Sequence, residues 1–305
     1  MPEGPEVRHN AELLERLLAG VKVTELVALP GGKLFRKGIP GADRFEPATV
    51  TAVRPRGKLI VISFDNNAVL TSSLGMAGWW YPGTLKRSAE LFGEKAYQRG
   101  KLVLAEDTIK HAYKHARVSL SGESSELATF CDMRNFGNME YYREGLPESK
   151  LRERIGLDLL NELPSMLDDM DLAKHMLLTM KRDAPRRLLQ MKMGNLALEQ
   201  SFIAGLGNIY RAEALWLSGI DPYRELDDLS DDEWLKFCEV AMTVLQIAYH
   251  TAGIMLYPSG VLTACTGEQF DKDCQGHLAY GKAADVFGRP IIRDDKFDRP
   301  LWRLA

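Results

Sequence analysis

The spacing of apolar residues changes once along this chain of 305 residues, and that change constrains the fold more than any other feature. Between residues 21 and 142 the apolar residues form short runs of strand character, separated by Gly, Pro and Asn-Asn turns. After residue 153 they recur at helical spacing. Strands followed by helices predict an α+β protein, with a β-sandwich or flattened barrel first and a helical domain second.

A helix is predicted before the strands, over residues 5–19, because Val7, Ala11, Leu14 and Leu18 recur at helical spacing. The first four residues therefore lie just outside a helix N-terminus. The predicted strands are residues 21–29, 49–53, 59–64, 68–72, 101–105, 116–120 and 126–132.

A polar stretch over residues 143–153 predicts a linker or a surface helix. The helices predicted after it are residues 172–180, 186–198, 208–218 and 230–251. The last begins with Ser230 and Glu233 at the spacing of a capping box, in which the Ser side chain accepts from the Glu amide. From about residue 253 the chain returns to short, turn-rich runs.

Composition excludes several classes of protein. No run approaches the roughly 18 apolar residues of a membrane span, and the start MPEGPEVR lacks the features of an export signal, so we expect an intracellular protein with no membrane partner. The net charge of −3 means that a nucleic-acid partner would need locally concentrated basic residues. Cys131, Cys238, Cys265 and Cys274 contain no CxxC, so we expect reduced cysteines and no zinc site.

The N-terminus carries a candidate nucleophile. The small residue Pro2 permits removal of Met1, which would leave a secondary amine able to attack a sugar aldehyde carbon and form an iminium ion. Glu3 beside it is a candidate acid or base. The alternative is that Pro2 and Pro5 only begin the helix.

Two further segments suggest contacts to nucleic acid. The turn at residues 205–208, Gly-Leu-Gly-Asn, brings the backbone and Asn208 to a helix N-terminus, where amides bind phosphate; the alternative is a purely structural turn. After a strand that ends at Asp132, Arg134 and Phe136 lie on the same side of an extended segment. Such a pair can replace an extruded base, although a solvated Arg beside a core Phe is the usual alternative.

The segments MPEGPEV, RGKLIV, SLGMAG, DMRNFG and IAGLGNIYRAEAL together resemble, in order and spacing, the formamidopyrimidine-DNA glycosylase and endonuclease VIII family of bifunctional base-excision enzymes. The resemblance runs from Pro2 to about Trp302. It implies a catalytic N-terminal helix with a two-layered β-sandwich, a helix–two-turns–helix domain, a DNA-binding cleft between the two domains and a C-terminal β-hairpin finger. The implied divisions are residues 1–145, a linker at 146–165, 166–255 and a finger at 256–305.

The resemblance also implies roles for individual residues. The catalytic residues are Pro2 as nucleophile, Glu3 as acid or base, Lys58 at the lesion phosphate and Arg299 as the finger arginine, with Arg289, Arg293 and Arg303 as open alternatives to Arg299. The DNA-binding residues are Asn208 on the backbone, Met76, Arg134 and Phe136 in the void left by the extruded base, and Glu6 and Glu213 at acidic motif positions.

Departures from the family pattern affect the finger and the phosphate contacts. Residues 286–288 lack the usual cysteines, which implies a zincless finger packed by Phe287, Ile291 and Trp302, with no metal and no cofactor. Ser73 and Gly194 stand where the family usually has His and Lys. A compensating basic face, with an ordinary solvated face as the alternative, would comprise Lys181, Arg182, Arg186, Arg187 and Lys192.

The function implied is a bifunctional DNA glycosylase and abasic-site lyase that acts on damaged DNA, as a monomer, through a proline Schiff base and β,δ-elimination. Oxidised pyrimidines, formamidopyrimidines and abasic sites are the expected substrates. The main alternative is a damaged-DNA-binding homologue that has lost catalysis. A ribosomal helix–two-turns–helix protein would explain the turn at residues 205–208 but not the N-terminus.

Overall fold

The computed structural model describes residues 2–84, 95–98, 101–104, 110–163 and 170–305, which fall into two compact units. The first comprises Pro2 and the described residues of Glu6–Lys150; the second comprises Glu3–Pro5 and those of Leu151–Ala305. Met1, Ala105 at the end of a predicted strand, and the predicted boundary at residues 165 and 166 lie outside the described residues. The further separation of a finger from the helical domain stays a prediction.

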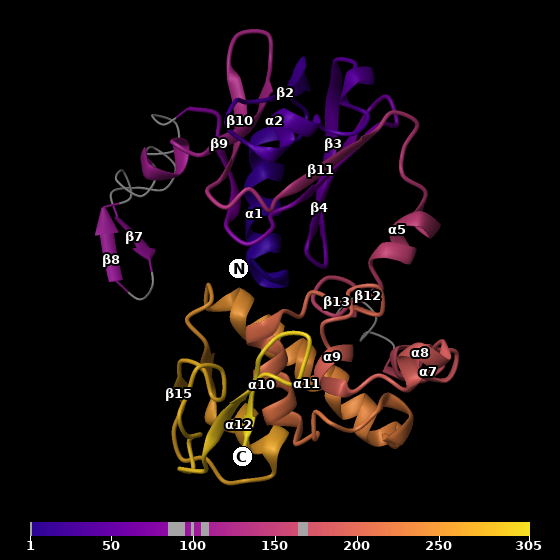
Figure 1. Cartoon of the computed structure of the whole chain (residues 1–305), viewed down its shortest axis with the longest axis vertical. Coiled ribbons are helices and arrows are strands. Elements are labelled where there is room, and N and C mark those ends of the chain that lie inside the picture. Colours follow the sequence, from indigo (N-terminus) through magenta and orange to yellow (C-terminus); the bar gives the residue numbers. More distant parts are fainter. Residues whose placement is uncertain (1, 85–94, 99–100, 105–109, 164–169) are drawn as a thin grey trace. The chain divides into compact units, whose positions relative to one another are not determined.

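The first unit is built from two antiparallel sheets (Figure 1). One has the order β1 (Lys22–Val23), β3 (Ala48–Arg56), β4 (Leu59–Phe64), β5 (Val69–Ser73) and β11 (Asn138–Tyr142). The other has the order β2 (Glu25–Ala28), β9 (Ala116–Ser121), β10 (Glu126–Asp132) and β6 (Gly78–Pro82). The unit also contains the pair β7 (Lys95–Gln98) and β8 (Lys101–Leu104), the short helix α2 (Lys33–Lys37) and the 3-10 turn η1 (Ala42–Arg44). The predicted two-layered β-sandwich is confirmed, although the strands β6, β7 and β11 and the helix α2 were not predicted.

Helix α1 (Gly4–Leu18) shares one hydrophobic core with both sheets. The residues predicted for its apolar face, Val7, Ala11, Leu14 and Leu18, are at most 1% exposed. The Asn10 side chain accepts from the Trp80 amide (2.9 Å) and donates to the Trp80 carbonyl (2.8 Å), which fixes α1 on strand β6. The helix is therefore anchored by both apolar burial and a paired buried amide.

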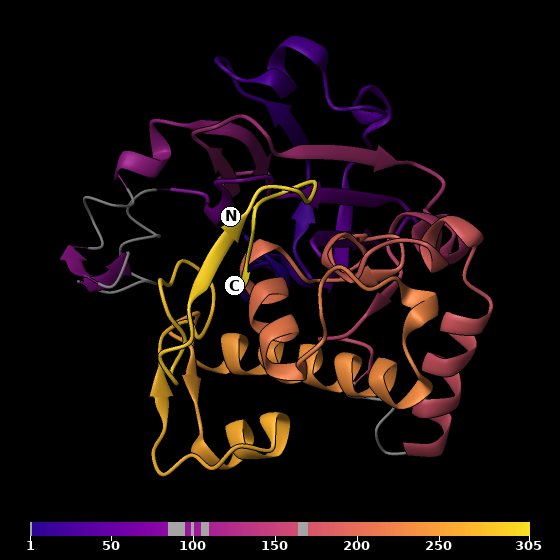
Figure 2. The same cartoon turned by 60° about the horizontal axis from the view of Figure 1, so that its bottom comes forward.

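The second unit is mainly helical, and its elements are as follows. They are β12 (Leu157–Asp158), α7 (Met170–Arg182), α8 (Arg186–Leu189), α9 (Met193–Leu196), β13 (Ile203–Ala204), α10 (Asn208–Ser218), η2 (Leu226–Asp228), α11 (Asp231–His250), β14 (Leu256–Tyr257), α12 (Ser259–Thr266), β15 (Cys274–Gln275), β16 (Ile291–Asp294) and β17 (Leu301–Leu304). Helix α5 (Glu148–Arg154) begins in the first unit and ends in the second. Helix α10 packs against α11, α12 and β17 (Figures 1 and 2).

Helices α10 and α11 have the predicted positions, and Ser230 accepts from the Glu233 amide (3.2 Å) as the capping box requires. The single helix predicted over residues 186–198 is wrong. The chain is extended at Lys192, which pairs with Glu225, and the break separates α8 from α9. No helix in the described ranges is long and apolar enough to cross a membrane.

Candidate functional site

The carboxylate of Glu3 is buried at the N-terminus of helix α10. Glu3 is 1% exposed, and its oxygens accept from the amides of Ile209 (3.1 Å) and Tyr210 (3.3 Å). The amide of Gly4 donates to the carbonyl of Gly205 (2.9 Å). The first turn of a helix has unpaired amides and a positive dipole end, and both stabilise a carboxylate. The structure thus joins two motifs that lie about 200 residues apart, and half-buried Pro2 directly precedes this carboxylate.

The glycines of the turn at residues 205–208 serve this contact. Gly205 has φ +101°, which disfavours any residue with a side chain, and a Cβ at Gly207 would lie 2.1 Å from the Glu3 carboxyl carbon. The backbone of this turn therefore does come close to a negatively charged group, as the sequence suggested. In this structure that group is the Glu3 carboxylate and not a phosphate. The amides of α10 that could face a phosphate include two that already bond this carboxylate.

Arg211, to which the sequence assigned no role, is the buried centre of the same region. It is 0% exposed, and it donates to the carbonyls of Gly194 (2.6 Å), Arg299 (3.0 Å) and Pro300 (3.1 Å). It also donates to the side-chain oxygen of Asn208. Burial lowers the pKa of Arg211 to about 10, and the negative charge of Glu3 opposes that change. Two charged residues, Arg211 and Glu213, in a helix of mostly apolar residues were the available sequence signal.

Asn208 is half-buried and ties the C-terminal hairpin to α10. Its side-chain nitrogen donates to the carbonyl of Pro300 (3.0 Å), while its oxygen accepts from Arg211. The amide therefore already has protein partners on both its atoms. The position of Gly194 has no room for a side chain, because a Cβ there would lie 2.4 Å from the Phe297 ring. A lysine would not fit this buried position, so Gly194 is not a surface site that has lost a phosphate contact.

Glu213, expected as a DNA-binding residue, instead has a structural position. It is 0% exposed and accepts from the amides of Leu278 (2.7 Å), Ala279 (2.9 Å) and Tyr280 (2.8 Å) and from the Tyr257 hydroxyl (2.9 Å). A fully buried carboxylate with four donors has no face left for DNA. We correct its expected role: Glu213 holds the segment that leads into the C-terminal hairpin.

The C-terminal hairpin of β16 and β17 carries Arg299 in its turn, with the side chain exposed. Each of the three alternative arginines forms an ion pair within the same segment: Arg289 with Asp285 (2.6 Å), Arg293 with Asp295 (3.0 Å) and Arg303 with Asp294 (2.7 Å). Of the four, Arg299 also has its backbone fixed by Arg211. The assignment of Arg299, rather than one of these three, as the finger arginine stays a prediction.

Aromatic packing and a buried carboxylate hold this segment together. The Phe287 ring stacks on Trp216 (6.3 Å between centroids), Trp302 contacts Tyr280 (4.4 Å), and Ile291 is 6% exposed. Burial alone would raise the pKa of Asp285, but hydrogen bonds from Arg289 and the Phe287 amide lower it below its ordinary value. Among the described residues, no group of three His, Cys, Asp or Glu could hold a metal ion, and all four cysteines are free. The segment does not fit a zinc site, and a finger without zinc stays a prediction.

In the first unit, two touching loops carry Met76, Arg134 and Phe136; we call residues 74–77 and 133–137 the wedge loops. A Cβ at Gly75 would lie 2.5 Å from the carbonyl carbon of Phe136, so the two backbones are in contact. The Arg134 guanidinium lies over the Phe136 ring (5.6 Å), and Phe136 is 56% exposed. The structure therefore brings together the loops that carry three residues predicted from two separate motifs.

Buried polar groups support the second wedge loop from below. Asp132, 1% exposed, accepts from the amides of Arg134 (3.0 Å) and Gly137 (2.7 Å). Arg117, which the sequence did not single out, donates to the side chain of Asn135 (2.6 Å). Asn135 has φ +57°, a conformation that Asn tolerates better than most residues. The loop is thus pre-shaped while its tip stays exposed.

The other predicted residues of the first unit are Lys58 and Glu6. Lys58 follows Gly57 in the tight turn between β3 and β4, as expected of a strand-turn lysine, and Gly57 has φ +55°. Glu6 is half-buried in the first turn of α1. Pro2, Glu6, Lys58 and the wedge loops belong to the first unit, whereas Glu3, Asn208, Glu213 and Arg299 belong to the second.

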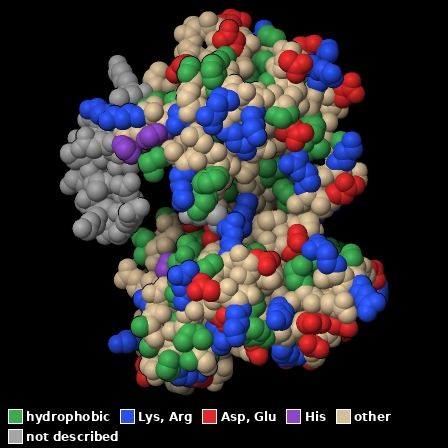
Figure 3. Space-filling model, viewed as in Figure 1, with side chains coloured by type: hydrophobic (Ala, Val, Ile, Leu, Met, Phe, Trp, Pro, Cys, Tyr) green, Lys and Arg blue, Asp and Glu red, His purple; other side chains and the backbone are tan. Residues whose placement is uncertain are grey.

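Most side chains of the predicted basic face have partners within the protein. Lys181 donates to the Leu229 carbonyl (2.6 Å) and pairs with Asp231, while Arg182 pairs with Asp183 and Arg187 with Glu199. Lys192 lies over the Tyr223 ring (5.0 Å). On the face drawn in Figure 3, Lys and Arg side chains are interspersed with acidic and hydrophobic ones. These pairs favour the alternative of an ordinary solvated helix face.

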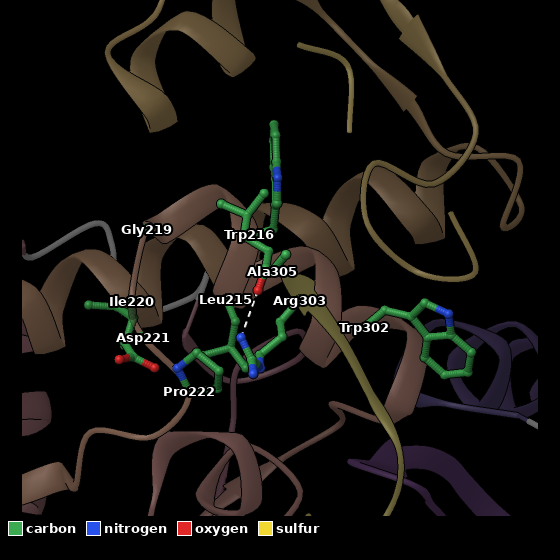
Figure 4. Close-up of a pocket in the computed structure, with 10 residues that line it drawn as sticks. Leu215, Trp216, Gly219, Ile220, Asp221, Pro222, Trp302, Arg303 and Ala305 are labelled. Atoms are coloured by element: carbon green, nitrogen blue, oxygen red, sulfur yellow. Dashed lines mark hydrogen bonds between the residues drawn. The ribbon is translucent and has the colours of Figure 1, made fainter. Parts of the chain in front are cut away.

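A pocket of about 310 Å³ lies at the C-terminal end of α10, and Figure 4 draws the residues that line it. Glu3 lies at the other end of this helix. Trp216, Gly219, Asp221, Trp302 and Arg303 contribute to its lining. The 11 residues of α10 span about 16 Å, which separates this pocket from the Glu3 carboxylate. Arg303 donates to the Leu304 carbonyl (2.7 Å) and pairs with Asp294, so its guanidinium serves the hairpin.

Two family models match the chain: the formamidopyrimidine-DNA glycosylase N-terminal domain over residues 1–139 and the formamidopyrimidine-DNA glycosylase H2TH domain over residues 175–257. Among curated proteins, the chain is 29% identical to a formamidopyrimidine-DNA glycosylase of Herpetosiphon aurantiacus, covering 96% of this chain and 94% of the relative. It is 27% identical to an endonuclease 8 of an Enterobacter species, covering 84% and 82%. The structure resembles that of the Lactococcus lactis formamidopyrimidine-DNA glycosylase bound to DNA with an abasic site (TM-score 0.66, 21% identity, 99% and 97% coverage).

Proposed function

The chain belongs to the formamidopyrimidine-DNA glycosylase and endonuclease VIII family and is a DNA glycosylase of base excision repair, and we propose that it acts through a Schiff base on Pro2. The proposed substrates are oxidised pyrimidines, formamidopyrimidines and abasic sites in DNA. One observation carries the proposal: the Glu3 carboxylate is held by the amides of α10 one residue away from the candidate amine. A carboxylate fixed in this way is a positioned acid or base, as opening of a deoxyribose ring requires.

The proposed chemistry begins once Met1 has been removed. The Pro2 nitrogen attacks C1′ of the extruded nucleotide, the C1′–base bond breaks, and the ring opens with Glu3 serving the proton transfers at the sugar oxygen. The resulting iminium ion withdraws electrons from C2′, so a C2′ proton is lost and the 3′ phosphate leaves. A second elimination then expels the 5′ phosphate. This β,δ-elimination would give abasic-site lyase activity without a cofactor.

The wedge loops and the phosphate-binding residues serve extrusion of the damaged nucleotide. We propose that Met76, Arg134 and Phe136 fill the space that the nucleotide leaves, because an exposed aromatic ring beside a cation can replace a base in the stack. Lys58, Asn208 and Arg299 would hold the flanking phosphates, which position the strand but do not read its sequence.

Borohydride trapping tests the nucleophile. Incubating the protein with an abasic-site or thymine-glycol duplex and reductant should give one covalent adduct with the N-terminal peptide. Pro2→Gly and Glu3→Gln should lose most of the nicking. Pro5→Ala is the matched control, because it also changes a proline at the helix start. This variant should still form the covalent adduct. If both prolines only began the helix, the two substitutions should instead have similar effects.

Two results would overturn the assignment. If Pro2→Gly and Glu3→Gln nick as well as the unmodified chain, these residues do not have the proposed roles. If the protein binds lesion duplex yet forms no adduct, and its mature N-terminus retains Met1, it is a damaged-DNA-binding homologue.

An excision panel across oxidised pyrimidines and purines ranks the substrates. Metal analysis of the purified protein should find no stoichiometric zinc.

A further inference from the structure

The wedge loops hold the two exposed methionine side chains of the described part of the chain. Met76 is 37% exposed and Met133 is 54% exposed. The other methionines whose burial the structure describes are buried, as for Met139 (1%), or half-buried. A thioether reacts with peroxides according to its exposure, so these two positions are set apart from the others.

The strand pairing places both methionines on one surface of the first unit. Ser73 pairs with Asn138, and Gly78 pairs with Asp132, so the two loops leave the two sheets side by side. The Gly75 backbone touches Phe136, as described above. One methionine is therefore in each of two touching loops, next to Arg134 and Phe136.

We propose that Met76 and Met133 are oxidation sites through which hydroperoxides reversibly weaken the binding of lesion DNA. The proposal rests on the proposed function of the wedge loops. In the reaction the peroxide O–O bond breaks, one oxygen atom bonds to the methionine sulfur, and the other leaves as water or an alcohol. The sulfur loses two electrons and the peroxide gains them. The product, a polar sulfoxide, is less suited than a thioether to contact base faces.

The two buried thiols, Cys131 and Cys238, do not compete for this reaction, while Cys265 and Cys274 are half-buried and lie outside the wedge loops. Cys131 is 3% exposed, and burial raises its pKa to about 12. Cys238 is 0% exposed, and burial raises its pKa well above the ordinary value. A peroxide reacts with the thiolate, which these cysteines do not form at neutral pH. A chain that meets oxidised DNA under peroxide stress thus presents thioethers at the wedge loops. Methionine sulfoxide reductases reverse the oxidation of these thioethers.

The test is graded hydrogen peroxide treatment of the full chain, followed by peptide mass mapping and by affinity for a lesion duplex. We expect oxygen to be added to Met76 and Met133 before Met139, and the affinity to fall about tenfold, the size expected for the loss of one good sulfur contact. Treatment with methionine sulfoxide reductases A and B should restore it. After peroxide treatment, the double variant Met76→Leu/Met133→Leu should bind the lesion duplex as tightly as its own untreated sample. The control Met139→Leu should lose affinity on treatment, as the unmodified chain does.

The proposal is overturned if Met76 and Met133 oxidise no faster than Met139, or if the double leucine variant loses as much affinity as the unmodified chain. Nicking by untreated protein is scored separately. If untreated protein does not nick, the proposed catalytic function fails, while mass mapping and lesion binding still decide whether these methionines control binding. A loss of affinity without sulfoxide at either position would also contradict the proposal.

Discussion

The wedge loops of the first unit and the surroundings of α10 in the second unit use charged residues in opposite ways. Arg134 and Phe136 are both exposed at the tip of their loop. The buried carboxylate of Asp132 holds the backbone of this loop from below. Around α10, Glu3, Arg211 and Glu213 are at most 1% exposed, and each bonds backbone groups far away in the sequence. Substitutions around α10 should therefore change stability and geometry, whereas those at the loop tips should change binding alone.

Glu213→Ala gives the largest expected effect. The substitution leaves the buried amides of Leu278 and Ala279, the amide of half-buried Tyr280 and the Tyr257 hydroxyl without their acceptor. We expect the free energy of unfolding to fall by about 3–5 kcal/mol, measured by denaturant titration, because several buried donors lose one charged partner. Glu213→Gln, which keeps one acceptor oxygen, should lose less. A loss below about 1 kcal/mol for the alanine variant would show that Glu213 does not organise this segment.

Arg211→Met is the next largest. Methionine fills much of the same volume but removes the donor of the Gly194 and Arg299 carbonyls and one of the two donors of the Pro300 carbonyl, so we expect a loss of about 2–3 kcal/mol in unfolding free energy. If Arg211 also positions Arg299 and Asn208, the KM for lesion DNA should rise more than kcat falls. Arg211→Lys, which keeps the charge and some donors, should recover part of both. An unchanged KM in a folded Arg211→Met variant would leave Arg211 a purely structural residue.

The sequence predicted the local parts of this comparison well. The bounds of α10 and the capping box at Ser230 each depend on signals within a few positions, and each lies where it was predicted. Arg134 and Phe136 lie together as their spacing predicted, while their role at DNA stays a prediction. Glu3 was also singled out beside the candidate amine, and its role as acid or base stays a prediction. What the sequence did not reveal is that the glycines of the turn at residues 205–208 make room for this carboxylate.

The missed features depend on contacts between distant segments. Arg211 is buried because carbonyls from residues 194, 299 and 300 meet at its guanidinium, and no local pattern encodes that convergence. Glu213 was expected at DNA because it matches an acidic position of the family motif, and that motif does not reveal that the amides of residues 278–280 cover it. The break at Lys192 also depends on a remote partner, Glu225.

At the loop tips, Phe136→Ala should leave stability within about 0.5 kcal/mol of the unmodified chain, because the ring is 56% exposed. The affinity for lesion duplex should fall about tenfold, since a stacking side chain contributes about 1–3 kcal/mol per base. Asp132→Asn is the contrasting variant: it weakens the buried support of the loop, so both stability and affinity should fall. Equal stability losses in the two variants would remove the distinction between tip and support.

The smallest expected effect is the pH dependence contributed by Asp294. Burial alone would raise the pKa of Asp294, but hydrogen bonds from Tyr223 (2.7 Å), Arg303 (2.7 Å) and the Lys296 amide (3.1 Å) bring it down to about 2. A carboxylate with a depressed pKa stabilises the folded state above its ordinary pKa of 3.8, and this contribution is lost as the pH falls toward 2. Asp294→Asn should therefore cost about 1 kcal/mol at pH 7 and less at pH 3.

Denaturant midpoints measured between pH 3 and pH 7 check this dependence. The matched control is Asp295→Asn, because Asp295 is 67% exposed and pairs with exposed Arg293 on the surface of the same hairpin. Since exposed pairs contribute little, this variant should follow the unmodified chain at every pH. A cost for Asp294→Asn that stays constant from pH 7 to pH 3 would mean that the Asp294 charge does not hold the hairpin. The contrast with the exposed loop tips would then rest on the buried charges around α10, which are Glu3, Arg211 and Glu213.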